Sequence, residues 1–243
     1  MIKKIKPILI TLALLAYIIF TFAFVNKKND AMLITGIDIN IIDSLNTHFI
    51  SDSEIKNLIL KNHPNIIGKS AASINKEKLE TLINKIPSVK NTEVFNSLSG
   101  CLHLEIEQRK PIVRLLKGKG FYIDEEGKRM PLSSNYTSRV LVVSGHIKDK
   151  MIEAELMPLV NFITKDEFWS SQINQIYVDS NDEYILIPRV GGQKIELGKI
   201  DNFERKFSKL LALYKEGFST VGWNKYKKIN LKYENQVVCT KRQ

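Results

Sequence analysis

One segment, residues 86–132, constrains the fold more than any other part of the chain. Its strand Cys101–Gln108 alternates, with Leu102, Leu104 and Ile106 on one face and His103, Glu105 and Glu107 on the other. A period of two residues is that of a β-strand in a sheet that is covered on one face. Pro111 ends this strand, because proline has no amide hydrogen for the ladder. The following residues 121–131 predict a hairpin in which Gly127 supplies the turn.

The residues before this segment predict two helices. A strand over Leu33–Ile42 precedes a capping-box pattern at Ser51–Glu54, and Asn75 can cap a second helix. With the strand Val89–Phe95, the order becomes β-α-α-β-β in about 75 residues, a small sheet with two helices on one face. The apolar strand face must then meet the apolar helix stripes, so we expect a core that contains Leu104, Ile106, Ile55, Leu58 and Leu82.

The N-terminus decides where such a domain works. Residues 7–25 contain no charge, and about 20 apolar residues suffice to cross a bilayer. Three lysines precede this run and two follow it, which favours a cytoplasmic tail over residues 1–6 and the bulk of the chain in the periplasm. A cleaved signal peptide, with Thr21–Ala23 as the cleavage site, is the alternative. We expect the anchor to be retained, because the run exceeds the apolar core of a signal peptide, about 7–15 residues.

Charge and cysteine content exclude some classes of function. The formal net charge is +10, but without the five lysines beside the apolar run the chain has 31 basic and 26 acidic residues. So small an excess does not predict nucleic-acid binding. Cys101 and Cys239 lie in predicted strands far apart in sequence. An oxidising compartment would permit a disulfide between them, but we expect both to be free thiols.

The remainder, residues 116–243, predicts a mixed, β-rich domain with packing helices. The final strands form a hairpin with a two-residue turn. The predicted elements are strands at Arg139–Ser144, Asn174–Asp179, Tyr184–Ile187, Lys194–Leu197, Lys227–Tyr233 and Gln236–Lys241, a helix at Lys150–Thr164 kinked by Pro158, a helix after Asp201 or Asn202 that ends at Gly217, and the turn at Glu234–Asn235.

No motif for chemistry emerges. The four histidines fall in four different predicted elements, without the spacing of a metal site, and no GxSxG motif is present. Glu105 and Glu107 share a strand face, which is better interpreted as a solvated surface than as a catalytic pair. The sequence therefore predicts no enzyme, no cofactor, no metal and no small-molecule substrate, which leaves binding through a sheet edge.

The combination of motifs resembles a known family of division proteins, FtsQ/DivIB. The motifs that carry the resemblance are Ile86–Val94, Leu102–Gln108, Arg109–Pro111, Phe121–Asp124, Gly127–Pro131, Trp223–Tyr226, Ile229–Tyr233 and Gln236–Val238. The closing motifs are similar to those of Bacteroidetes members. The resemblance implies an α+β protein with an N-terminal transmembrane helix, a POTRA-like domain over residues 33–115 and a β domain over residues 116–243. The tail before the apolar run is shorter than in many members, which weakens any docking role in the cytoplasm.

The resemblance also implies a function. Members are non-catalytic, single-pass scaffolds of the inner membrane, enriched at the septum, that bind the FtsB–FtsL pair and so act on septal wall synthases. The implied contact is strand addition to the last strand, with partner-binding residues Lys232, Tyr233, Asn235, Gln236, Val237 and Val238. A membrane-anchored POTRA-type assembly or chaperone factor is the alternative function, and a wall-binding module released by cleavage is a third.

Overall fold

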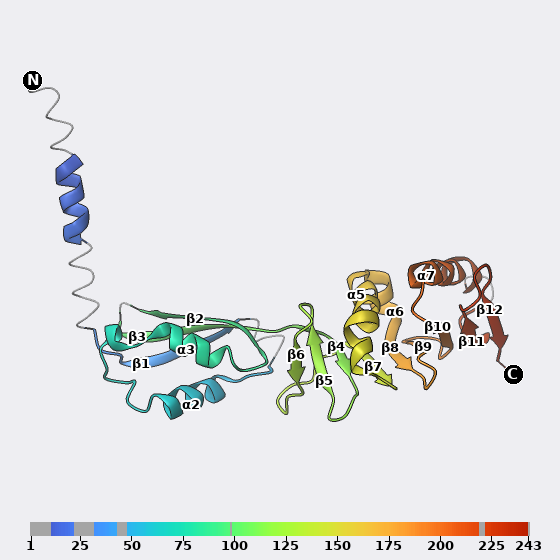
Figure 1. Cartoon of the computed structure of the whole chain (residues 1–243), viewed down its shortest axis with the longest axis horizontal. Helices are drawn as coiled ribbons and strands as arrows, with labels where there is room; N and C mark the ends of the chain where they lie inside the picture. The colour runs from blue at the N-terminus through green and yellow to red at the C-terminus, as the bar shows by residue number, and fades with distance from the viewer. Residues whose placement is uncertain (1–10, 22–31, 43–47, 98, 219–221, 243) are drawn as a thin grey trace, which may run out of the picture. The chain divides into compact units, whose positions relative to one another are not determined.

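The structure is a computed structural model that describes residues 11–21, 32–42, 48–97, 99–218 and 222–242. The chain divides into two compact units, Met1–Gln108 and Arg109–Gln243, which are described separately here (Figure 1). The sequence had suggested a boundary after residue 115. The structure differs because the strand Pro111–Leu115 pairs with strands of the second unit.

The first unit has the expected β-α-α-β-β order. Its elements are β1 (Gly36–Ile42), α2 (Asp52–Asn62), η1 (Ala71–Ser73), α3 (Lys76–Ile83), β2 (Val89–Asn96) and β3 (Cys101–Gln108). The three strands form a sheet in the order β1-β3-β2, in which β1 runs parallel to β3 and β2 antiparallel to it. The alternating strand is therefore the central one, where a partner on each side fixes its register.

Both helices of this unit begin where the sequence signals predict. The Ser51 side chain accepts from the backbone N–H of Glu54, and the Glu54 carboxylate accepts from the N–H of Ser51 at 2.9 Å, which completes the capping box. The side chain of Asn75 accepts from the N–H of Lys78 at 2.9 Å. Each cap satisfies amides that the first helical turn leaves without a partner.

The core of the first unit forms on the predicted strand face. Leu104 and Ile106 are completely buried, and Ile55 packs in the same cluster. Two helix positions differ from expectation, because Leu58 and Leu82 are partly exposed and lie outside this core. On the same two helices, Ile59, Leu79 and Ile83 are buried, in agreement with the expected apolar stripes. Leu58 and Leu82 therefore lie at the border of the helix faces that form the core.

The second unit is built on one sheet of nine strands, in the order β12-β11-β10-β9-β8-β7-β4-β5-β6. The strands are β4 (Pro111–Leu115), β5 (Phe121–Asp124), β6 (Arg129–Pro131), β7 (Leu141–Gly145), β8 (Ile173–Val178), β9 (Tyr184–Pro188), β10 (Lys194–Gly198), β11 (Tyr226–Asn230) and β12 (Val238–Lys241). The predicted hairpin β5–β6 is confirmed. Three pairs (β4–β7, β7–β8, β10–β11) are parallel and the other five are antiparallel, which makes the sheet mixed.

Helices pack on one face of this sheet and enclose a second core (Figure 1). They are α4 (Asp149–Met151), η2 (Ile152–Leu156), α5 (Met157–Lys165), α6 (Glu167–Gln172), α7 (Phe203–Ala212) and η3 (Leu213–Gly217). The helix expected over Lys150–Thr164 is divided into α4, a π-helical turn, η2, and α5, and Pro158 lies in the first turn of α5. Helix α6 had no counterpart in the sequence expectation. Trp169, which it carries, lies edge-on to Phe207 at 4.8 Å between ring centroids.

Only part of the expected membrane anchor falls in the described range. Residues 11–21 are helical and mostly exposed. The other residues of the expected span 7–25, and the tail 1–6, lie outside the described residues. No helix in the described part of the chain is long and apolar enough to cross a membrane. Cys101 and Cys239 are free thiols and belong to different units.

Candidate functional site

The last strand, β12, is the outermost strand of the nine-stranded sheet. It pairs antiparallel with β11, with Cys239 opposite Ile229 and Val238 opposite Asn230. Within the described part of the chain, no strand pairs with its other side. An edge of this kind presents unpaired N–H and C=O groups that another strand can use. The expectation that the last strand is an edge is therefore confirmed.

The register shows which amides of this edge are free. The N–H of Arg242 donates to the carbonyl of Lys225 at 2.9 Å, so it points toward the β11 side. Because N–H groups alternate sides along a strand, the amides of Val238 and Thr240 point the same way. Those of Cys239 and Lys241 point outward. The sequence had left this direction open.

Most of the expected partner-binding residues precede β12. β11 ends at Asn230, so the β11–β12 connection comprises residues 231–237. The two-residue turn that the sequence suggested is therefore wrong. Of the expected residues, Val238 begins the strand, whereas Lys232, Tyr233, Asn235, Gln236 and Val237 lie in the connection.

Helix α7 holds this connection in place. The Lys209 ammonium donates to the carbonyls of Leu231 and Glu234, at 3.3 Å each, and to that of Tyr233 at 2.5 Å. Arg205, one turn earlier, donates to the Asn235 side chain at 3.0 Å. Burial lowers the pKa of Lys209, because desolvation disfavours its charged form. Sequence reasoning missed both cations, although their i,i+4 spacing places them on one helix face.

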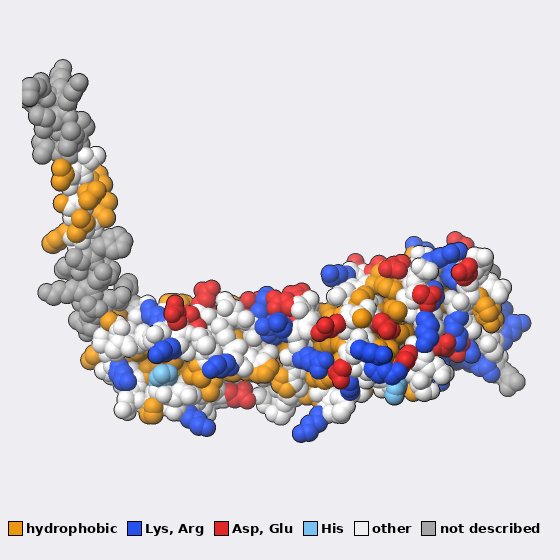
Figure 2. Space-filling view, viewed as in Figure 1, with side chains coloured by type: hydrophobic (Ala, Val, Ile, Leu, Met, Phe, Trp, Pro, Cys, Tyr) orange, Lys and Arg blue, Asp and Glu red, His pale blue; other side chains and the backbone are white. Residues whose placement is uncertain are grey.

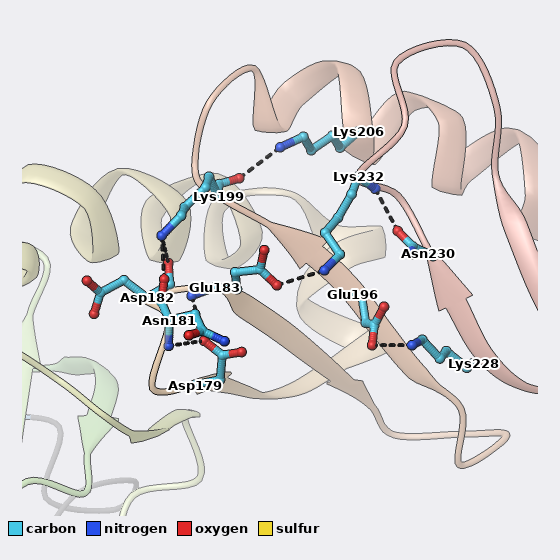
Figure 3. A network of polar contacts seen from close by, with 10 residues as sticks. All are labelled: Asp179, Asn181, Asp182, Glu183, Glu196, Lys199, Lys206, Lys228, Asn230 and Lys232. Atoms are coloured by element: carbon cyan, nitrogen blue, oxygen red, sulfur yellow. Dashed lines mark hydrogen bonds and ion pairs between the residues drawn. The ribbon is translucent and has the colours of Figure 1, made fainter.

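The Lys232 side chain already forms an ion pair within the second unit. Its ammonium pairs with the Glu183 carboxylate at 2.7 Å, as Figure 3 shows, and this hydrogen bond raises the pKa of Lys232. Its backbone N–H donates to the Asn230 side chain at 2.9 Å. Its stem passes over Gly198, where an added Cβ would lie 2.7 Å from the Lys232 Cγ. This residue therefore stabilises the start of the connection and is a weaker candidate for a direct contact.

The remaining surface beside the edge is basic and has two exposed apolar side chains. Tyr233 is 50% exposed and Val238 41%. Lys225, Lys227 and Lys241 are also exposed, and Figure 2 shows Lys and Arg side chains gathered toward the C-terminal end of this unit. Cys239 and Val237 instead turn toward the core. Burial raises the pKa of the Cys239 thiol, which keeps it protonated and poorly nucleophilic.

Metal-binding side chains do not converge in the described residues, where no group of three or more His, Cys, Asp or Glu could hold an ion. His103, on the polar face of β3, pairs with Asp38 at 2.8 Å and stacks on Phe95 at 5.5 Å between centroids. The four histidines have no shared site.

The fold and this edge define a class of protein, a POTRA-like domain joined to a β domain with an open last strand. Residues 33–107 match the family model of the POTRA-like domain, and residues 110–240 match that of "FtsQ/DivIB, C-terminal related". The chain belongs to the FtsQ/DivIB family. A curated relative, "Cell division protein FtsQ" of Geotalea daltonii, is 24% identical over 170 residues, which cover 65% of this chain. The match spans 61% of that relative, less than two thirds of its length.

Proposed function

We propose that this chain is a non-catalytic scaffold of the bacterial division machinery, and that it binds the FtsB–FtsL pair by strand addition to β12. The open β12 edge, in the domain that matches the family, is the observation that carries the proposal. The curated relative, whose name assigns it to cell division, supports the biological setting. Through this contact the scaffold positions or regulates septal wall synthases.

The physical basis of the proposed contact is main-chain pairing with a charged surround. Strand addition draws affinity from backbone hydrogen bonds, and here Cys239 and Lys241 present the outward amides. The exposed lysines beside the edge favour an acidic partner segment and speed its approach at low salt. Tyr233 offers an aromatic surface at the entrance to the strand, where such side chains often contribute most to binding.

We also propose where the protein is located in the cell. A retained helix over residues 7–25 anchors the chain in the cytoplasmic membrane, with residues 1–6 inside and the two units in the periplasm. The uncharged run and its lysine flanks support this orientation. Reporter fusions at Gln243 should be active only outside the cytoplasm, and the protein should concentrate at the septum. A freely soluble, shortened periplasmic form would contradict the anchor.

Paired proline and alanine substitutions test the docking edge. Lys241→Pro removes an outward N–H, whereas Lys241→Ala keeps that N–H and removes the same charge. Cys239→Pro and Cys239→Ala form a second pair. We expect both proline variants to lose capture of purified FtsB–FtsL, while the alanine variants keep most of it. The ladder to β11 does not use these amides, so tryptophan emission should report an intact fold.

Two further variants separate the edge from its surroundings. Removing residues 237–243 should abolish capture and block division while the protein still reaches the membrane. Val238→Pro removes an amide that points toward β11, so it should first weaken the β11–β12 pairing. If the outward proline variants and the truncation all capture the partner as well as the unaltered chain does, the docking edge lies elsewhere.

The alternative function, strand capture by the first unit, would use an edge strand of its sheet, β1 or β2. Strand β2 is an edge of the three-stranded sheet, but the N–H of Val94 already donates to the Glu80 carboxylate of α3 at 2.9 Å. An amide used within the domain cannot pair with a client strand. This edge is therefore less available than β12 to an assembly or chaperone client.

A further inference from the structure

A cavity of about 220 Å³ opens at the strand ends in the middle of the nine-stranded sheet. It lies where β7 and β8 begin and β9 ends, and the end of α5 covers it. Apolar side chains from four elements line it, namely Ile112 of β4, Leu141 of β7, Ile163 of α5 and Ile173 of β8. Its volume is below the roughly 300–1,000 Å³ of pockets for drug-sized ligands, so it suits a small group.

Two arginines line the same cavity. Arg139 precedes β7 and Arg189 follows β9, and both side chains are exposed. Neither guanidinium forms a hydrogen bond or ion pair with another described residue. Arg189 is nevertheless fixed at its backbone, since its N–H donates to the Gln172 carbonyl at 2.8 Å. No carboxylate is among the described residues that line the cavity, so its cations lack a counter-charge there.

The two hydroxyl groups in the lining already donate hydrogen bonds within the protein. The Thr164 hydroxyl donates to the Val160 carbonyl at 2.9 Å, and the Ser170 hydroxyl donates to the Glu167 carbonyl at 3.0 Å. The side-chain donors left for a ligand are therefore the two guanidiniums, which bind planar oxyanions well because their N–H groups form a rigid fork. Two like charges around one cavity also repel, and an anion between them relieves that repulsion.

We propose that this cavity binds a carboxylate that carries a short aliphatic group. The carboxylate lies between Arg139 and Arg189, and the aliphatic group covers the isoleucine and leucine side chains below. An anion without apolar surface, such as inorganic phosphate, would leave that floor uncovered, so the lining favours the carboxylate. This site is separate from β12 and does not depend on the proposed function. The same chemistry occurs at the C-terminal residue of a polypeptide and in a free short-chain acid.

Nuclear magnetic resonance of the full-length chain, labelled with ¹⁵N-arginine, tests the proposal. The probes are N-acetyl-L-alanine, 2-methylpropanoate, the uncharged N-acetyl-L-alaninamide and inorganic phosphate. We expect both acids to shift the Nε–H signals of Arg139 and Arg189, and the amide to shift neither. Tighter binding of N-acetyl-L-alanine points to a polypeptide terminus, and tighter binding of 2-methylpropanoate to a free acid. Binding of neither acid, equal binding of the amide, or phosphate binding as tightly as the acids would overturn the proposal.

Single substitutions give a second, independent readout. Arg139→Gln and Arg189→Gln should each raise the Kd of the better acid by roughly tenfold, the usual effect of losing one charge-assisted contact. Arg129→Gln is the matched control, because it removes the same charge from a residue that pairs with Asp149 and does not line the cavity. An equal rise of the Kd in the control would mean that general electrostatics, and not this cavity, attracts the acids.

Discussion

Leu104 of β3 allows the packing of the first unit to be tested by one substitution. Its side chain is completely buried within a cluster that both helices contribute to. Leu104→Ala removes three carbon atoms, and at about 0.8 kcal/mol for each buried methylene the transfer part alone is roughly 2.4 kcal/mol. The void left in a well-packed core adds to this, so the free energy of unfolding should fall by about 2–5 kcal/mol.

The two units can be followed separately in the full-length chain. The sequence has two tryptophans, Trp169 and Trp223, and both lie in the second unit. In a urea titration, Leu104→Ala should move the circular dichroism transition to lower urea and leave the tryptophan transition in place. Leu186→Ala, at an equally buried position of the second unit, is the matched control and should move the tryptophan transition. A loss below about 1 kcal/mol for Leu104→Ala would refute the packing described here.

Two further predictions concern the second unit. Lys209→Met removes the donor to three carbonyls of the β11–β12 connection, so amide hydrogen exchange in residues 232–236 should accelerate and stability should fall by about 1–3 kcal/mol; Lys215→Met, at an exposed position nearby, should change neither. Burial raises the pKa of Tyr214 to about 12, so the unfolded chain loses this proton first as the pH rises above about 10, and stability should decline between pH 10 and 12 by up to about 1.4 kcal/mol per unit. Tyr214→Phe should remove that part of the decline, and identical pH profiles for the two proteins would contradict it.

The first unit was predicted well from the sequence because short sequence patterns mark its central strand and the starts of its helices. Alternation identified β3 and its buried face, and two cap residues located the helix starts. The partial exposure of Leu58 and Leu82, beside the buried Ile59 and Ile83, depends on packing between elements. Adjacent apolar residues fit a helical stripe about equally well, so periodicity alone could not choose between them.

The candidate site was predictable in position and not in detail. Chain order indicated that the last strand is an edge. The direction of its amides depends on the pairing register with β11, which no local pattern encodes. The long connection depends on Lys209 and Arg205, which lie more than twenty residues earlier in the sequence. The domain boundary was placed too late because Pro111 reads as the end of one strand, whereas it also begins the next.

The edge of the nine-stranded sheet opposite β12 is poorly suited to pairing with another strand. Its outermost strand, β6, spans only Arg129–Pro131, and proline at its end offers no amide. The Arg129 guanidinium lies over the Phe121 ring, 4.9 Å from its centroid, and adds charge to this edge. If both edge strands of a sheet are open, the edge of one copy can pair with the opposite edge of the next, and the copies can assemble head to tail into fibres. Because β6 offers little for pairing, two copies of the sheet could pair only through their β12 edges, which would close a dimer. Open-ended polymerisation through this sheet is therefore disfavoured.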